Sequence, residues 1–175
     1  MKLCVRNFIF IVFFAFAGKS NAVNVDLLVL YTADFANVNN AAATIQSYIS
    51  YSNQAFINSG IDIQYRLKHH QAHQISGGEE VSAGLRDRLF FDGQVMSLRG
   101  AYKPDIVVYL TRSSASLCGI AEFPSIIPYR MGPYANDREM ALKGVSVVGW
   151  DGGCGAWVFG HEIGHNLGAG HGPVA

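Results

Sequence analysis

The segment HEIGHNLGAGH, residues 161–171, combines a helical spacing with a sharp turn. His161 and His165 are four residues apart, so in a helix they lie on one face, one turn from each other. Gly168 can end that helix abruptly, because glycine adopts positive φ at no steric cost. The turned chain then brings back His171. The segment is therefore predicted to be the end of a helix and a turn that together gather three imidazoles.

Three imidazoles arranged in this way are typical of a catalytic zinc site. Each can bind Zn²⁺ through a ring nitrogen at about 2.0–2.1 Å, and three protein ligands leave a fourth position open. Glu162 directly follows the first histidine, so it can reach a water at the open position without being a ligand itself. A helix can carry His, Glu and His merely as a solvated face. The third histidine and the glycine at fixed spacing favour the metal site.

Strands and helices alternate along the chain that precedes this segment. Apolar runs predict buried strands, strict alternation predicts a half-buried one, and spacings of three and four predict helices. Asp34 could cap the first helix. An opening of strand, helix and strand normally makes two parallel strands. Strands are expected at 24–32, 61–68, 105–111 and 141–150, and helices at 41–57, 82–102 and 155–167.

Residues 1–22 are predicted to be a secretory signal peptide. Lys2 and Arg6 precede an unbroken apolar run of ten residues, 8–17, and small residues lead up to Ala22. A membrane anchor is the alternative, but spanning a bilayer takes about 20 apolar residues. We therefore expect cleavage after Ala22 and a secreted or periplasmic protein.

Composition bounds what the remaining residues, 23–175, can be. Half of the 175-residue sequence is apolar and only 15% is charged, which suits one domain with a sizeable core. The 13 basic and 13 acidic residues become 10 and 13 once Lys2, Arg6 and Lys19 are removed, a net charge of −3. A nucleic-acid binder needs a basic face, so we expect no nucleic-acid partner.

Cys118 and Cys154 are the two cysteines left after signal removal. In an exported protein such a pair is most simply a disulfide, and two free buried thiols are the alternative. The short stretch CGIAEF, residues 118–123, lies between polar and proline-rich segments and could be an edge strand.

HEIGHNLGAGH matches the metzincin zinc-peptidase motif HExxHxxGxxH at every fixed position. With the preceding CGAWVF at 154–159 and the upstream CGIAEF, it resembles the reprolysin (adamalysin)-like branch, in particular secreted bacterial enzymes related to peptidyl-Asp metalloendopeptidases. The resemblance implies a zincin-like α/β (α+β) fold. That fold has a mixed, mostly parallel twisted sheet, with an antiparallel edge strand above the cleft and an active-site helix below it.

The resemblance also implies roles for individual residues. It makes Glu162 the general base of peptide hydrolysis, with one catalytic Zn²⁺ as cofactor. The implied zinc ligands are His161, His165 and His171. An edge strand that includes Gly119, Ile120 and Ala121 would hold an extended protein or peptide substrate by β-augmentation. We further expect a monomer with no stable membrane association after signal cleavage.

The sequence ends four residues after His171. We therefore expect residues 23–175 to be an upper subdomain with the start of a lower one, without the Met-containing turn and specificity pocket of such enzymes. A non-catalytic or inactive zinc-binding fragment is the alternative to a working endopeptidase, and a zinc hydrolase acting on another substrate is a third reading. The intact Glu162 favours the endopeptidase.

A few other residues are open to two interpretations. The histidines within residues 69–73 could bind a second metal or form a solvated strand end. Asp151 could cap the last helix or orient a metal ligand. Trp150 and Trp157 flank the turn into that helix and are expected to lie in the core.

Overall fold

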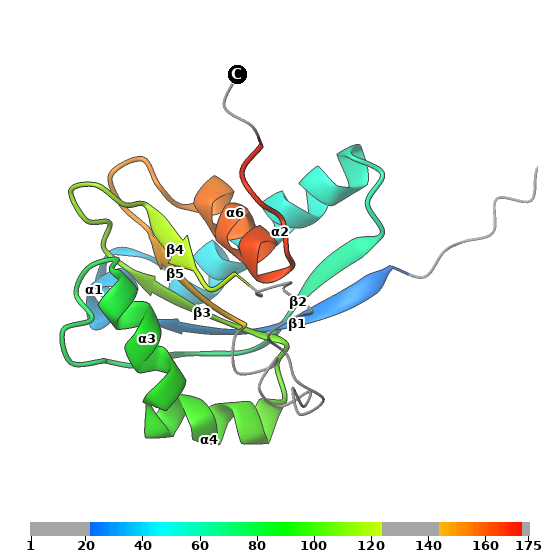
Figure 1. Ribbon diagram of the computed structural model, residues 1–175. Helices are drawn as coiled ribbons and strands as arrows, with labels where there is room; N and C mark the ends of the chain where they lie inside the picture. The colour runs from blue at the N-terminus through cyan, green and yellow to red at the C-terminus, as the bar shows by residue number, and fades with distance from the viewer. Residues whose placement is uncertain (1–21, 124–143, 173–175) are drawn as a thin grey trace, which may run out of the picture.

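The protein folds around one five-stranded sheet in the order β2-β1-β3-β5-β4 (Figure 1). The computed structural model describes residues 22–123 and 144–172. Neighbouring strands are parallel except β4, which is antiparallel to β5 at the sheet edge. This is the mixed, mostly parallel sheet predicted from the sequence. The strands are β1 (Val23–Tyr31), β2 (Ile63–Ala72), β3 (Ile106–Thr111), β4 (Gly119–Ala121) and β5 (Val145–Gly149).

Helices cover both faces of this sheet. In Figure 1, α2 and α6 lie on one side of it, and α3 and α4 lie on the other. The last helix, α6, contacts β5 and β4 and also packs against α2. The described helices are α1 (Ala33–Val38), α2 (Ala41–Asn58), α3 (Ala83–Phe91), α4 (Gly93–Tyr102) and α6 (Ala156–Asn166).

The central strand β1 is buried on both faces because its side chains alternate between two cores. Leu27 and Val29 belong to the core under α2 and α6, whereas Leu28 and Leu30 belong to the core under α3. All four are fully buried. Burying a side chain of this size stabilises a fold by about 1.5–3 kcal/mol. The unbroken apolar run therefore fixes β1 in the middle of the sheet.

Two helix boundaries differ from the predictions. Asp34 does not cap the first predicted helix, because Asn40 caps α2 and Asp34 lies within an additional short helix, α1, which Thr32 caps. The single helix predicted over 82–102 is wrong, because Asp92 divides it into α3 and α4. Asp92 has an extended backbone, and its Oδ1 accepts hydrogen bonds from the first turn of α4. A local side-chain cap here overrides a continuous apolar periodicity.

The two edges of the sheet differ in how their backbone groups are used. On the β2 edge, the side-chain amide of Asn53 in α2 bonds both backbone groups of Tyr65. Its Oδ1 accepts from the Tyr65 N–H at 2.8 Å, and its Nδ2 donates to the Tyr65 carbonyl at 3.0 Å. At this one position Asn53 thus takes the place of a further strand. The opposite edge, β4, lies beside α6.

Part of the predicted organisation falls outside the described residues. This applies to the signal segment apart from Ala22, and to residues 141–143 of the strand predicted over 141–150. No helix in the described part of the chain is long and apolar enough to cross a membrane.

In the structure Cys118 and Cys154 are joined through their sulfurs, with Cα atoms 5.5 Å apart and a sequence separation of 36. The bond would link the start of β4 to the loop that enters α6. Closing a loop of this length contributes about 4 kcal/mol in the chain-entropy treatment. We expect the Cys118→Ser/Cys154→Ser double variant to lose about that free energy of unfolding. Thiol titration of the unfolded, unreduced protein should find neither cysteine free, and two titratable thiols would contradict the pairing.

Candidate metal centre

Three imidazole nitrogens converge at the C-terminal end of α6. His161 and His165 lie one turn apart on the helix, and His171 returns to them after the turn that follows it. The Nε2 atoms are 3.1 Å apart in all three pairs. Nitrogens bound tetrahedrally to zinc at about 2.0–2.1 Å lie about 3.3–3.4 Å from one another. The observed triangle therefore fits one zinc-sized cation with little adjustment.

The turn after α6 orients one of these imidazoles as well as returning the chain. Gly168 has φ +95°, a value that side-chain-bearing residues rarely adopt. The turn places the Ala169 carbonyl 2.6 Å from His165 Nδ1. In a neutral imidazole the Nδ1–H then donates to this carbonyl, which leaves the Nε2 lone pair of His165 free. Such a bond is the usual support for a metal-bound histidine.

Glu162 lies on α6 between the two helical histidines and is only 6% exposed. Burial raises the pKa of Glu162 to about 7, an effect that neighbouring His165 opposes. Burial also lowers the pKa of His161, and the other two imidazoles add to this.

Strand β4 passes directly over this carboxylate. A Cβ built on Gly119 would lie 2.6 Å from both Cγ and Oε1 of Glu162. Such a separation is shorter than real Cβ contacts, so any side chain at position 119 would displace the carboxylate or the strand. The absence of a side chain at Gly119 therefore lets the sheet edge approach the helix this closely.

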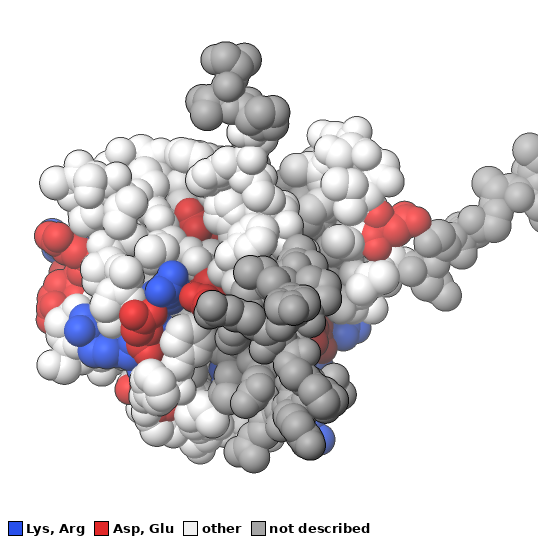
Figure 2. Space-filling view, in the orientation of Figure 1, with Lys and Arg blue, Asp and Glu red and all other residues white. Residues whose placement is uncertain are grey.

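A cavity of about 390 Å³ opens between β4 and the three histidines. None of the described residues that line it is Lys or Arg, and its one carboxylate is Glu162. Figure 2 shows most of the charged side chains in this view on the side of α3, with further ones at the right, whereas the surface over α6 is mostly uncharged. The lining residues are Gly119, Ile120, Ala121, Phe123, His161, Glu162, His165, Gly170 and His171.

The hydrogen bonds of the residues just before and just after β4 show which backbone groups of the strand are free to bind a further chain. The Cys118 carbonyl accepts from the Gly149 N–H at 2.6 Å, and the Glu122 N–H donates to the Val145 carbonyl at 3.0 Å. Backbone groups of a strand alternate in direction, and Cys118 and Glu122 both face β5. The backbone groups of Gly119 and Ala121 therefore face the open edge.

Asn166 and Ser146 also lie next to the cavity and β4, and no role for either of them was predicted from the sequence. Asn166 is the last residue of α6, and its side chain bonds main-chain groups next to β4 and β5. Ser146 is fully buried, and its hydroxyl bonds Asn166 Oδ1. The sequence does hold one indication of this contact. Ser146 is a polar residue inside the apolar run 145–149, and a buried hydroxyl needs a hydrogen-bond partner.

Two residues near the start of α6, Asp151 and Trp157, do not lie where the sequence predicted. Asp151 neither caps α6 nor approaches a histidine; its Oδ1 accepts from the backbone N–H and hydroxyl of Ser113, at 2.7 and 2.6 Å. The expectation that Trp157 is a core residue is wrong, since it is 54% exposed on α6. Trp150 packs against the core as expected.

The histidines of residues 69–73 do not gather around a common point. His73 pairs with Asp92 at 3.0 Å, whereas the His69 ring stacks on Tyr102 with ring centroids 4.1 Å apart. Among the described residues, the only group of three or more possible metal ligands is the triad of α6 and its turn.

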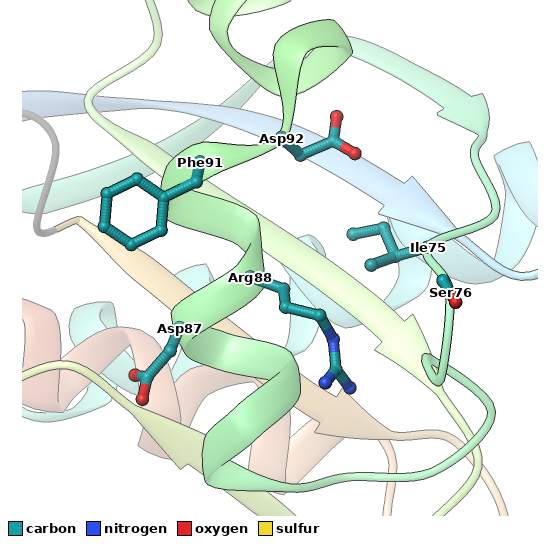
Figure 3. A pocket seen from close by; sticks show the side chains of 6 residues that line it. All are labelled: Ile75, Ser76, Asp87, Arg88, Phe91 and Asp92. Carbon is teal, nitrogen blue, oxygen red and sulfur yellow. The ribbon is translucent and has the colours of Figure 1, made fainter.

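A second cavity, of about 410 Å³, lies on the other side of the sheet between α3 and the loop after β2 (Figure 3). Arg88 points across it toward the loop and donates a hydrogen bond to the Gly77 carbonyl at 2.7 Å. Phe91 points away from that loop and is 87% exposed. No histidine lines this cavity, so it does not resemble the centre at α6.

Comparison with known proteins agrees with this geometry. Residues 42–172 match the family described as Metallo-peptidase family M12B Reprolysin-like. The chain belongs to this family. The match spans strands β2 to β5 and the histidine triad, so the predicted metzincin-like, reprolysin-type relationship is confirmed. Membership implies a metal ion, and the three converging imidazoles are the described residues that could hold it.

Individual relatives of this reprolysin-like chain are longer. It is 33% identical over 165 residues to the Peptidyl-Asp metalloendopeptidase of Pseudomonas aeruginosa, a match covering 90% of this chain and 27% of that protein. The chain thus spans about a quarter of the length of this curated relative. A solved structure titled "Structure of a chaperone-substrate complex" shares the fold, with TM-score 0.71 and 18% identity over 88% of this chain and 27% of that one. Metalloproteinase-II from Bacteroides fragilis gives TM-score 0.49 and 17% identity over 86% and 44%.

The turn at Gly168 is expected to hold His171 in place. Alanine there must adopt φ +95° or rearrange the turn, at a cost of about 1–2 kcal/mol. We expect Gly168→Ala to weaken metal binding by about 5- to 30-fold, the equivalent of that energy, measured by competition with a chromogenic chelator. Gly170→Ala is the control, because its added Cβ meets no atom within 4 Å and its φ is not positive. Equal affinities for the two variants would contradict this role of the turn.

Proposed function

We propose that this chain carries the metal-binding and substrate-holding parts of a secreted zinc metalloendopeptidase. The observation that carries the proposal is the convergence of three Nε2 atoms beside a buried carboxylate and an open sheet edge. Family membership supports the same activity.

Zinc is the proposed metal, with His161, His165 and His171 as its ligands. Three neutral nitrogens suit Zn²⁺, whereas Mg²⁺ and Ca²⁺ prefer oxygen ligands. The bond from His165 Nδ1 to the Ala169 carbonyl supports a neutral imidazole with its Nε2 facing the centre. When bound, zinc would supply a Lewis acid that polarises a carbonyl and lowers the pKa of water.

Glu162 is proposed as the general base. It would take a proton from the water that attacks the scissile carbonyl carbon, and then donate that proton to the departing amine nitrogen as the C–N bond breaks. Its position on α6 next to His161 keeps the carboxylate within the cavity without making it a fourth ligand. Its burial under Gly119 limits the orientations that the side chain can adopt.

The substrate is proposed to be an extended peptide that pairs with β4 through Gly119, Ile120 and Ala121. The backbone groups of Gly119 and Ala121 face the open edge, so a peptide could add as a further strand. The cavity between β4 and α6 would then receive the peptide bond to be cleaved. Only protein and peptide substrates present such a repeating backbone.

Secretion is proposed from the signal-like segment of residues 1–22. Strand β1 begins at Val23, directly after the predicted cleavage site, so the fold loses no strand residue when the segment is removed. N-terminal sequencing of the exported protein should therefore begin at Val23.

The first test separates a peptidase from a non-catalytic zinc-binding fragment. We expect one equivalent of zinc per chain, and cleavage of a quenched-fluorescent peptide library that a chelator abolishes and added zinc restores. Glu162→Gln should keep the zinc but lower kcat by about 10²- to 10⁴-fold, because it removes the general base.

Glu79→Gln is the matched control, since Glu79 is exposed and lies in the loop after β2, outside the lining of the α6 cavity. Cleavage that survives both the chelator and Glu162→Gln would contradict the proposal. Bound zinc without any cleavage would support the fragment alternative.

The second test concerns the substrate strand. Ala121→Pro removes one backbone N–H that faces the open edge, and proline is tolerated at such a position. We expect KM for extended peptides to rise by roughly 2- to 12-fold, the equivalent of one hydrogen bond of about 0.5–1.5 kcal/mol, with a smaller change in kcat. Ala121→Ser keeps the N–H and should behave like the wild type. Gly119 is unsuitable here, because any side chain there would also displace Glu162.

A further inference from the structure

The side chain of Asn166 connects α6 to both strands at the open sheet edge. Its Nδ2 donates to the Glu122 carbonyl at 2.7 Å and to the Val145 carbonyl at 3.0 Å. Its Oδ1 accepts from the hydroxyl of Ser146. Both amide hydrogens and the amide oxygen are therefore bonded.

These contacts lie at the point where β4 separates from β5. Glu122 follows the last residue of β4, and Val145 is the first residue of β5. The Val145 carbonyl accepts from both the Glu122 N–H and Asn166 Nδ2. Since β4 has only three residues, its own ladder holds this end weakly, and the Asn166 amide adds a bond from the helix.

The two carbonyls determine which way the amide faces, and Ser146 completes its hydrogen bonding. An asparagine amide can turn over and exchange its oxygen and nitrogen. The Glu122 and Val145 carbonyls can only accept, so they require the NH₂ group, and the fully buried Ser146 hydroxyl then donates to Oδ1. Turning the amide over would place its oxygen against the Glu122 and Val145 carbonyls, which cannot donate.

The other end of β4 is fixed on the same helix by different means. Gly119 rests on the Glu162 side chain, and Cys118 is joined to Cys154 just before α6. Strand β4 is thus held against α6 at both ends, by steric contact near Glu162 and by the Asn166 amide four residues further along the helix. Asn166 also directly follows His165, so the same helical turn carries a proposed ligand and the bond to the strand.

We propose that Asn166 is a positioning residue that sets where the substrate strand β4 lies relative to Glu162. It touches neither the substrate nor the metal in this role, and it acts through the Glu122 carbonyl at the end of β4. This role rests on the proposed function, because the peptide bond would be presented to Glu162 by a peptide paired with β4.

Asn166→Asp is the most direct test in the full chain, exported so that the disulfide can form. Aspartate keeps the size of the side chain and an oxygen for the Ser146 hydroxyl, but it places an oxygen against two carbonyls. We expect KM for extended peptides to rise about tenfold or more, with a smaller change in kcat and unchanged zinc stoichiometry. A variant that was merely less stable would lose apparent kcat at constant KM, because fewer molecules would be folded.

Asn40→Asp is the matched control for the change in charge. Asn40 caps α2 by accepting from the Ala43 N–H, a role that aspartate performs equally well, so KM should not change. Ser146→Ala is a milder second variant in case Asn166→Asp folds poorly. It leaves both donors of Asn166 in place but removes the partner of Oδ1, which weakens the hold on the side chain, so KM should rise in the same direction by a smaller factor.

Hydrogen exchange of the β4 backbone amides gives a readout that does not depend on cleavage. We expect exchange of the Ile120 and Glu122 N–H groups, which face β5, to be about tenfold faster in Asn166→Asp than in Asn40→Asp, while α6 remains protected. Unchanged exchange and unchanged KM in Asn166→Asp would overturn the positioning role. If the wild-type chain does not cleave peptides, the proposed function fails, and the exchange experiment still decides whether Asn166 holds β4.

Discussion

The close contact between a buried carboxylate and a sheet edge constrains the rest of this structure. Glu162 is nearly inaccessible because β4 covers it, and β4 can do so only where it carries no side chain, at Gly119. This contact removes water from the carboxylate, and it also places β4 as one wall of the cavity beside the three imidazoles. The disulfide at Cys118 and the amide of Asn166 both act on the same short strand and keep it in that position.

Much of this arrangement could be predicted because its signals are local in sequence. The strands of the sheet follow from apolar runs, and the triangle of imidazoles follows from a helical spacing, a glycine and a returning histidine. Membership of the reprolysin-like family agrees with that spacing. The contacts of Asn166 could not be predicted in the same way, because its partners are main-chain carbonyls 21 and 44 residues away. Any residue type offers such a carbonyl, so no side-chain pattern marks it.

Other predictions failed because the position of a residue depends on contacts that apolar periodicity does not show. Asp92 ends one helix and starts another, although leucine and valine continue at helical spacing on both sides of it. Asp151 binds Ser113 across 38 residues instead of acting on the adjacent helix. Trp157 is exposed despite its size, because it lies on the face of α6 that also carries His161. A pattern of apolar residues does not show which hydrogen-bond partner a polar side chain will have, nor which face of a helix will remain exposed to solvent.

The capping of Tyr65 by Asn53 has a consequence for how the folded protein behaves at high concentration. Unpaired strand edges can recruit other extended chains, and long ones promote sheet-to-sheet self-association. The ten-residue strand β2 would be the more dangerous edge, but α2 supplies an amide that occupies its backbone at Tyr65. The two hydrogen bonds from Asn53 therefore make pairing with a further strand less favourable at that position. The capped position interrupts the longer of the two edges of the described sheet, and this limits the length of β2 on which a second copy could pair.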